Sequence, residues 1–393
     1  MVRTIELFSG TGGLALGLHR AGFIPVVLLE RDEKSCYNIN ANISNGNSEL
    51  TGWKVNQTDV RDVMFTDYGT DIQFVTGGPP CQPFSIGGKH RSNSDSRDMF
   101  PEAVRAVREL KPQGFIFENV RGLLRQSFNE YFNYILLQLS HPEVTARDSM
   151  DWFSHYKLLK EYHKSKADKS LEYSVVYKLL NAADYGVAQQ RQRVVIVGFR
   201  SDLNINWSFP IKTHSREALL YAKYGDKSYW DEHKIAKKHR TEASSMEVKL
   251  TQVVDKSVLG ERWQTVRDAI GELPDPCKND THGYTNHEYR GGAKSYAGHS
   301  GSVLDEPSKT IKAGVHGVPG GENTITLDDG SLRYYTVRES ARIQAFPDSF
   351  AFHGSWTESM RQIGNAVPVK LASAIGESII AQMNRNGVGY AKN

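Results

Sequence analysis

The chain begins with Arg3-Thr4-Ile5-Glu6-Leu7-Phe8, which has the pattern of a β-strand, and the glycine turn Ser9-Gly10-Thr11-Gly12-Gly13 follows directly. Residues 13–21 then show the apolar spacing of a helix. Glycines between a strand and a helix let a ligand approach the backbone at the helix N-terminus. Because the spacing departs from the full dinucleotide fingerprint, the turn indicates a cofactor site without identifying the cofactor.

Strand-like and helix-like segments continue to alternate through the first half of the chain. The predicted strands cover residues 4–8, 25–30, a run ending at 76, and 114–118, and the predicted helices cover 13–21, 33–43 and 101–110. Such alternation predicts a mostly parallel sheet covered by helices, with ligands at the carboxyl ends of the strands. We therefore expect an α/β fold whose N-terminal half is a Rossmann-type sheet.

The second half of the chain is less regular. A polar, helix-like insertion lies between Leu139 and Tyr173, and strands resume over residues 174–180 and 193–199. From 209 to 335 the alternation is lost and Gly, His, Lys, Tyr and Asp become frequent, which indicates a second domain. Helical spacing returns at residues 337–344 and 369–383.

Composition places the chain among ordinary globular proteins. Its 393 residues are 39% hydrophobic, carry a net charge of +3 and include three widely spaced cysteines. This length favours two domains, and the cysteines favour neither a disulfide framework nor a metal site. No apolar run approaches the ~20 residues that span a bilayer, so we expect a cytoplasmic protein. The small net charge means that any contact with a polyanion must be local.

The sequence Pro79-Pro80-Cys81-Gln82 follows an apolar run and a glycine pair, and it places a thiol where a strand becomes a loop. A free cysteine is commonly a small buried hydrophobe. Here, however, two prolines stiffen the approach and glycines in the following loop permit unusual backbone angles. Phosphate-binding donors also flank the thiol, namely Gln82, Ser85, Lys89, Arg91 and Arg97. We interpret Cys81 as a nucleophile.

Two acidic residues are candidates for cofactor binding. Glu30 ends the second predicted strand about 20 residues after the glycine turn, where an acidic side chain binds ribose hydroxyls in nucleoside-binding sheets. Asp59 follows the next polar-to-apolar transition and is a candidate acceptor for an adenine amine. The alternative for Glu30 is an exposed strand end.

Charged residues at two further positions are candidates for catalysis. Glu118 ends an apolar strand that should neighbour the one leading to Cys81, where a raised pKa would let it hold a proton. Its alternative role is at a helix start capped by Asn119. Arg191 and Arg193 alternate on an incipient strand and should share a face suited to an anion or a polar base edge. Surface charge is the alternative for both arginines.

The order of these segments resembles that of the DNA (cytosine-5) methyltransferases, prokaryotic restriction-modification type, which use S-adenosylmethionine. Six blocks carry the resemblance, in family order along nearly the whole chain: Phe8-Ser9-Gly10-Thr11-Gly12-Gly13, Gly78-Pro79-Pro80-Cys81-Gln82-Pro83-Phe84-Ser85, Glu118-Asn119-Val120, Gln189-Gln190-Arg191-Gln192-Arg193, Arg338-Glu339-Ser340-Ala341-Arg342 and Gln362-Ile363-Gly364-Asn365-Ala366-Val367-Pro368. The resemblance implies a Rossmann-type methyltransferase sheet with a smaller, irregular target-recognition domain.

The resemblance also implies catalytic roles by position. Cys81 would attack C6 of a flipped-out cytosine, so that C5 becomes nucleophilic enough to accept the methyl group. Glu118 would contact N3 and the exocyclic amine and supply a proton. Arg193 would hold the cytosine O2, with Arg191 in support.

For the cofactor, the resemblance implies that Glu30 contacts the ribose, Asp59 the adenine, and Asn365 completes the pocket. Arg31 stands where many relatives carry an aromatic residue that stacks on adenine, and a guanidinium can also stack there. The other implied pocket residues are Phe8, Gly10, Thr11, Gly12, Gly13, Val60, Pro80 and Ala366.

For double-stranded DNA, the resemblance implies a catalytic and cofactor-binding domain at residues 1–208 and a target-recognition domain at 209–335. A hinge and bracing segment would follow at 336–361, and residues 362–393 would return to the catalytic domain. The expected DNA contacts are Gln82, Ser85, Lys89, Arg97, Arg290, Lys309 and Lys312. We expect a monomer, with any cognate restriction endonuclease acting separately.

Three alternatives remain open from sequence alone. A related enzyme could methylate cytosine in transfer RNA, although the short cysteine-containing motif expected of that branch is missing. A catalytically silent nucleic-acid reader would have no need of Cys81, Glu118 and Arg193 together. A nicotinamide-dependent oxidoreductase would rest on the glycine turn and Glu30 and would leave the cysteine block unexplained.

Overall fold

The computed structural model describes residues 1–80, 98–147, 150–165, 171–253, 259–276, 283–294, 300–313 and 323–388. The chain forms two compact units. Unit 1 comprises Met1–Leu180, Gln192–Phe209 and Ile375–Asn393, and unit 2 comprises Asn181–Arg191 and Pro210–Ala374. These units record where the chain is compact. The functional boundaries predicted from the sequence stay predictions, because compactness does not identify the residues that contact DNA.

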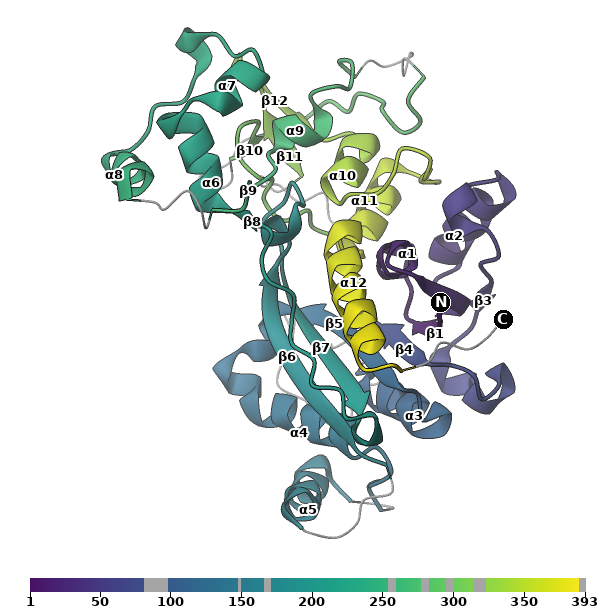
Figure 1. The fold of residues 1–393 in the computed structure, drawn as a ribbon. Helices are drawn as coiled ribbons and strands as arrows, with labels where there is room; N and C mark the ends of the chain where they lie inside the picture. The colour runs from purple at the N-terminus through teal and green to yellow at the C-terminus, as the bar shows by residue number, and fades with distance from the viewer. Residues whose placement is uncertain are drawn as a thin grey trace. The chain divides into compact units, whose positions relative to one another are not determined.

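Unit 1 is built on a seven-stranded sheet with the strand order β3-β2-β1-β4-β5-β7-β6 (Figure 1). The strands are β1 (Val2–Leu7), β2 (Phe23–Glu30), β3 (Val55–Gln57), β4 (Phe74–Gly77), β5 (Gly114–Val120), β6 (Tyr173–Asn181) and β7 (Gln192–Arg200). Neighbouring strands from β3 to β5 pair in parallel, whereas β7 runs antiparallel to β5. The expected α/β fold with a mostly parallel Rossmann-type sheet is confirmed.

The helices of unit 1 are α1 (Gly13–Arg20), α2 (Glu33–Ser44), α3 (Phe100–Leu110), α4 (Asn129–Ser140), α5 (Trp152–Lys164) and the C-terminal part of α12 (Val369–Arg385). Local sequence explains several helix starts. Asp32 caps α2 by accepting a hydrogen bond from the Ser35 N–H at 2.9 Å. Pro101 lies in the first turn of α3, where its missing N–H costs nothing.

One hydrophobic core cluster of unit 1 lies on one face of the sheet and gathers inward-facing residues from several strands. Ile5 and Leu7 of β1, Val75 of β4, and Phe115 and Phe117 of β5 are fully buried in it. On the other face, Gly376 of α12 lies against α1, because a Cβ at this position would come within 2.7 Å of the Ala21 Cβ. The sheet is therefore covered on both faces, as the apolar strand sequences predict.

Unit 2 contains short elements in place of a large sheet. Its strands form a two-stranded sheet, β8 (His214–Ser215) and β9 (Glu261–Arg262), and a three-stranded sheet, β10 (Ser302–Val303), β11 (Thr324–Thr326) and β12 (Leu332–Tyr334). Its helices are α6 (Arg216–Leu220), α7 (Ser228–Glu232), α8 (Ser245–Val253), α9 (Val266–Ile270), α10 (Val337–Ile343), α11 (Trp356–Asn365) and the start of α12. The loss of alternation in the sequence thus corresponds to a real change of architecture. Across the described parts of both units, no helix combines the length and the apolar character needed to span a membrane.

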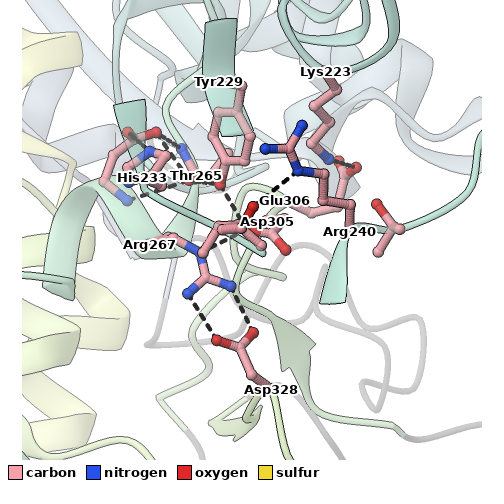
Figure 2. A network of polar contacts seen from close by, with 12 residues as sticks. Lys223, Tyr229, His233, Arg240, Thr265, Arg267, Asp305, Glu306 and Asp328 are labelled. Atoms are coloured by element: carbon pink, nitrogen blue, oxygen red, sulfur yellow. Dashed lines mark hydrogen bonds and ion pairs between the residues drawn. The ribbon is translucent and has the colours of Figure 1, made fainter. Parts of the chain in front are cut away.

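A polar network stabilises unit 2 around the buried Tyr229 (Figure 2). The Tyr229 hydroxyl donates to Asp305 Oδ1 at 2.8 Å, and Arg267 Nε donates to the same oxygen at 2.6 Å. The other two nitrogens of Arg267 donate to Asp328, which follows β11. Burial raises the pKa of Tyr229, so this hydroxyl remains a donor at neutral pH. Arg267 thereby links α9 to Asp305, which follows β10, and to Asp328, which lies in the turn between β11 and β12.

The two carboxylates that share Arg267 provide a matched test of this network. The Asp305 side chain is 9% exposed and the Asp328 side chain is 44% exposed. We expect Asp305→Ala to lower the free energy of unfolding by about 3–5 kcal/mol, because it removes the buried acceptor that the Arg267 Nε–H and the Tyr229 hydroxyl share. Asp328→Ala should cost below about 1 kcal/mol, as solvent screens that pair. Urea denaturation of both variants measures the difference, and equal losses would contradict the role given to Asp305.

Candidate active site

The turn between β1 and α1 has the backbone conformation that its glycines allow. Gly10 and Gly12 have φ angles of +53° and +82°, and Phe8 also lies in the left-handed region at +54°. A non-glycine residue in this region is uncommon and is often found at ligand sites. A Cβ added at Gly10 would meet no atom within 4 Å, so the turn borders open space. Thr11 is buried, and its hydroxyl accepts a hydrogen bond from Asn38 Nδ2 of α2 at 2.9 Å.

Glu30 at the end of β2 holds this turn in place. Its Oε2 accepts a hydrogen bond from the Gly10 N–H, and its Oε1 accepts from the N–H groups of Arg31 and Asp32, all at 2.8 Å. A carboxylate offers about four lone-pair sites, so Oε2 can still accept one more donor. The predicted ribose contact is compatible with this geometry, and the structure adds a second role in ordering the Gly10 backbone.

Asp59, which follows β3, is engaged by two arginines. Arg61 contacts both of its carboxylate oxygens, at 2.9 and 2.6 Å, and Arg31 Nη1 reaches Oδ2 at 3.3 Å. Hydrogen bonding from Arg61 holds the pKa of Asp59 well below its usual range. Asp59 is therefore an ionised acceptor, but binding an adenine amine would require it to share oxygens that Arg61 now uses. Val60, the next residue, is buried.

Two glycines shape the end of β4, immediately before the predicted nucleophile. A Cβ at Gly77 would lie 2.3 Å from the Leu7 carbonyl oxygen of β1, so no other residue fits there without moving the backbone. A Cβ at Gly78 would lie 3.3 Å from Glu118 Oε2. Beyond them, Asn119 Nδ2 donates to the carbonyl oxygen of Pro79 at 2.8 Å. The Met99 N–H donates to the carbonyl oxygen of the exposed Pro80 at 3.0 Å. The backbone leading to Cys81 is thus held from both sides.

Glu118 and Arg193 form a largely buried ion pair on the neighbouring strands β5 and β7. Arg193 Nε lies 2.6 Å from Glu118 Oε1, and each side chain is 11% exposed. Burial lowers the pKa of Arg193, and the charge of Glu118 opposes that shift. Because β4 pairs with β5 up to Gly77 and Phe117, Glu118 lies beside the strand that leads to Cys81, as the sequence predicts. Glu118 and Asn119 belong to β5, so the alternative of a capped helix start is wrong.

Several predicted site residues lie outside the described residues. They are Cys81, Gln82, Ser85, Lys89 and Arg97. Cys36 is described and is not a second candidate nucleophile. It is buried, and burial raises the pKa of its thiol to about 12. It remains a neutral thiol at neutral pH.

In unit 2, Arg191 joins two of the sequence blocks. Its side chain is buried and donates to the carbonyl oxygens of Ile311, Gly364 and Ala366 at 3.1, 2.6 and 3.1 Å. Arg191 and Arg193 therefore have different partners, and Arg191 shapes the backbone around Ala366. Asn365 is the exposed last residue of α11. Its predicted place in the cofactor pocket stays a prediction, because Phe8 and Glu30 belong to unit 1.

The predicted DNA contacts of unit 2 are exposed. Arg290 stacks over the Trp356 ring at 4.4 Å, and Lys309 Nζ donates to the Ser300 carbonyl at 2.6 Å. Lys312 is exposed, and its backbone exchanges two hydrogen bonds with the Asn323 side chain, at 3.1 and 3.2 Å. Asn323 thus joins the two ends of the glycine-rich segment 314–322, which lies outside the described residues.

Sequence reasoning missed or misassigned several supporting residues. Asn38 positions Thr11, Asn119 positions Pro79, and Asn323 positions Lys312. Each is a buried or half-buried amide whose partner lies elsewhere in the sequence. Of the three, Asn119 belongs to a resemblance block. No local sequence pattern predicts such contacts, because they depend on which strands and loops become neighbours in the fold.

Among the residues that the structure describes, two side-chain groups have the composition of metal ligands. In the first, His141, His163 and Glu172, the two imidazoles are already hydrogen-bonded at 2.8 Å. In the second, Asp268 and Glu232 bind the guanidinium of Arg262. Two nitrogen ligands of one tetrahedral zinc ion, each ~2.0–2.1 Å from the metal, lie farther apart than the 2.8 Å between the imidazole nitrogens of the first group. Neither arrangement is preorganised for an ion.

Comparisons with known proteins place the chain in one family. The family model described as C-5 cytosine-specific DNA methylase matches residues 2–143 and 154–381. The chain is 32% identical over 401 residues to the Type II methyltransferase M.PspPI from a Psychrobacter species, covering 97% of this chain and 79% of that protein. It is 31% identical over 387 residues to M.NgoMIV of Neisseria gonorrhoeae, covering 97% and 98% of the two chains.

Solved structures share the fold at lower identity. S. pombe Dnmt2 methyltransferase matches with a TM-score of 0.56 and 18% identity, covering 98% of this chain and 99% of that one. The Entamoeba histolytica methyltransferase EhMeth matches with a TM-score of 0.58 and 14% identity over the same shares of the two chains. The family match and the Type II relatives together show that this chain belongs to the C-5 cytosine-specific DNA methylases and is a DNA cytosine-5 methyltransferase.

Proposed function

We propose that the protein transfers a methyl group from S-adenosylmethionine to C5 of a flipped-out cytosine at a specific sequence in double-stranded DNA. The observation that carries this proposal is the buried Glu118–Arg193 pair beside the strand end that leads to Cys81. A carboxyl and a guanidinium at this place can read the polar edge of a cytosine while the thiol reaches its ring.

In the proposed reaction, the Cys81 thiolate forms a bond to C6, and the C5–C6 π electrons move to C5. Glu118 holds a proton at N3 so that negative charge does not accumulate on the ring. C5 would then take the methyl group from the sulfonium of the bound donor, whose sulfur–methyl bond breaks to leave a neutral thioether. Loss of the C5 proton to a base restores the double bond and expels the Cys81 thiolate. A thiolate suits both steps because it is a good nucleophile and a good leaving group.

The ion pair implies a change at Glu118 and Arg193 when cytosine binds. In the ligand-free structure, the positive charge of Arg193 at 2.6 Å opposes protonation of Glu118. Movement of Arg193 to the cytosine O2 would remove that opposition and leave Glu118 free to share a proton with N3. Substrate binding would thereby prepare the acid, which accounts for how a paired carboxylate can donate a proton.

For the methyl donor, the residues of unit 1 fit the expected group. The open space beside Gly10 and the remaining acceptor site on Glu30 Oε2 suit a nucleoside with ribose hydroxyls. When bound, S-adenosylmethionine supplies the methyl group from its sulfonium. Phe8, Gly12, Gly13 and Asp59 would line the same edge of the sheet.

We assign target recognition to residues 209–335, where exposed Arg290, Lys309 and Lys312 would contact DNA. Residues 336–361 would brace this region, since the buried Arg338 donates to three backbone carbonyls within unit 2. The end of the chain, 362–393, would return to the catalytic domain. We expect the enzyme to act as a monomer in the cytoplasm, with any cognate nuclease separate.

The first test is methyl transfer from labelled S-adenosylmethionine to duplex DNA and, in parallel, to transfer RNA. We expect labelled 5-methylcytosine in DNA at one short motif, which base-resolution sequencing would identify. Methylation of RNA alone would move the protein to the transfer RNA branch. Absence of transfer to either substrate would favour a nucleic-acid reader without catalysis.

The role of Cys81 predicts a separation of catalysis from binding. Cys81→Ser should lower kcat by several orders of magnitude, because the weaker nucleophile cannot form the C6 adduct. Affinity for duplex DNA, measured by gel shift, should remain within a few-fold of the unchanged protein. Cys36→Ser is the matched control and should retain turnover. Full activity of Cys81→Ser would exclude the proposed mechanism.

The geometry of Glu30 predicts a defect in cofactor binding. Glu30→Ala should weaken S-adenosylmethionine binding by roughly 10–100-fold, because it removes an acceptor from the ribose and from the Gly10 backbone. Isothermal titration calorimetry measures this affinity without requiring turnover. Glu49→Gln, which alters a carboxylate paired with Arg20, is the control and should leave affinity unchanged. Unchanged affinity in Glu30→Ala would remove Glu30 from the pocket.

A further inference from the structure

Glu6 is a buried carboxyl group that the proposed reaction does not use. It lies on β1, between β2 and β4, and is 1% exposed. Its neighbours Ile5 and Leu7 point into the apolar core, so Glu6 faces the other side of the sheet. A buried ionisable side chain in a central strand is costly unless it has partners. Its partners therefore indicate why the chain tolerates it.

One oxygen of Glu6 serves the start of α1. Glu6 Oε1 accepts a hydrogen bond from the Ala15 N–H at 3.2 Å. Ala15 is the third residue of α1, whose N-cap Gly12 provides no side-chain acceptor. The first N–H groups of a helix have no partner within it, so they need an external acceptor. Glu6 supplies one from the preceding strand and so fixes the helix that follows the Ser9–Gly13 turn.

The other oxygen of Glu6 serves β4. Glu6 Oε2 and Thr76 Oγ1 are hydrogen-bonded at 3.2 Å, and these two residues are also direct partners in the β1–β4 register. Thr76 is followed by Gly77, whose backbone is pressed against Leu7, and then by the segment leading to Cys81. A single carboxyl group thus contacts both the helix behind the cofactor turn and the strand behind the nucleophile.

The protonation state of Glu6 fits this arrangement. Burial raises its pKa to about 8, so the group is mainly a neutral acid at neutral pH. The Ala15 N–H donates to Oε1, and the Thr76 hydroxyl donates to Oε2. A glutamine keeps an acceptor oxygen for the Ala15 N–H, and its amide can donate to the Thr76 oxygen, since a hydroxyl can accept as well as donate. Glutamine is therefore the conservative replacement.

We propose that Glu6 is a positioning residue that sets the placement of the cofactor turn relative to the strand carrying Cys81. This inference rests on the proposed functions of the Ser9–Gly13 turn and of Cys81. The sulfonium methyl group and the thiol must approach two adjacent atoms of one cytosine ring, C5 and C6, and small misplacements of reacting groups are costly to rate. Linking both supports through one buried group would keep their spacing constant during catalysis.

The test compares three variants by steady-state kinetics on duplex DNA, together with S-adenosylmethionine affinity by calorimetry. Glu6→Gln should stay within about threefold of the unchanged enzyme in kcat, since it preserves both hydrogen bonds. Glu6→Met should lower kcat by roughly 10–100-fold and also weaken cofactor binding. Thr76→Val removes only the β4 contact, so it should lower kcat with little change in cofactor affinity.

A double-mutant cycle tests whether the two contacts act as one unit. If Glu6 acts through Thr76, the double variant Glu6→Met/Thr76→Val should have the kcat of Glu6→Met alone, whereas independent residues would give multiplied losses. Multiplied losses would overturn the coupling. Unchanged kcat and affinity in Glu6→Met would overturn the proposal altogether.

A control separates positioning from simple loss of stability. Val75→Ala removes buried apolar volume on the opposite face of β4 without touching Glu6 or Thr76. Assays run well below the unfolding midpoints of all variants should leave Val75→Ala active and Glu6→Met impaired. Equal impairment of both would show that Glu6 is merely structural. Because the unchanged enzyme is assayed alongside, failure of the proposed function would appear there as absent methyl transfer and could not be mistaken for failure of this inference.

Discussion

The close approach of β1 and β4 is the constraint on which the catalytic unit depends. The Leu7 carbonyl oxygen occupies the space where any side chain at position 77 would begin, so Gly77 is required by the backbone itself. This contact lets two parallel strands run together to their carboxyl ends before one turns into the glycine turn and the other into the Pro79-Pro80 segment. Because parallel strands end at a common edge, the Ser9–Gly13 turn and the Pro79-Pro80 segment emerge side by side.

The carboxylates at this edge are already engaged in the ligand-free protein. Glu30 accepts three backbone N–H groups, Asp59 binds Arg61, and Glu118 binds Arg193. Such contacts hold the side chains in ordered conformations, which reduces the entropy lost when ligands bind. The carboxylates also differ in how easily they can bind a ligand. Glu30 can accept a further donor as it stands, whereas in the proposed reaction Glu118 would exchange the guanidinium of Arg193 for a cytosine.

Much of unit 1 could be predicted from sequence because its signals are local. Apolar runs bounded by turns located β1, β2, β5 and β7, and the same runs placed Glu30 and Glu118 at predicted strand ends. The short, largely exposed strand β3 was missed, since three residues carry too little periodicity to detect. Pairings between distant residues were also beyond sequence reasoning. In the sequence, Glu6 is one polar residue in an alternating strand. Its contacts with α1 and β4 are visible only in the folded structure.

Unit 2 shows how arginines can be abundant without making a strongly basic surface. Arg191 and Arg338 are buried and donate to backbone carbonyls, and Arg267 is neutralised by two aspartates. These side chains build the architecture of a region that has little regular secondary structure to support it. The whole chain carries a net charge of +3, which is only a small excess of positive charge. Because nonspecific affinity scales with the number of phosphates neutralised, this small excess predicts a weak general attraction to DNA, so that selectivity would rest on contacts with the bases.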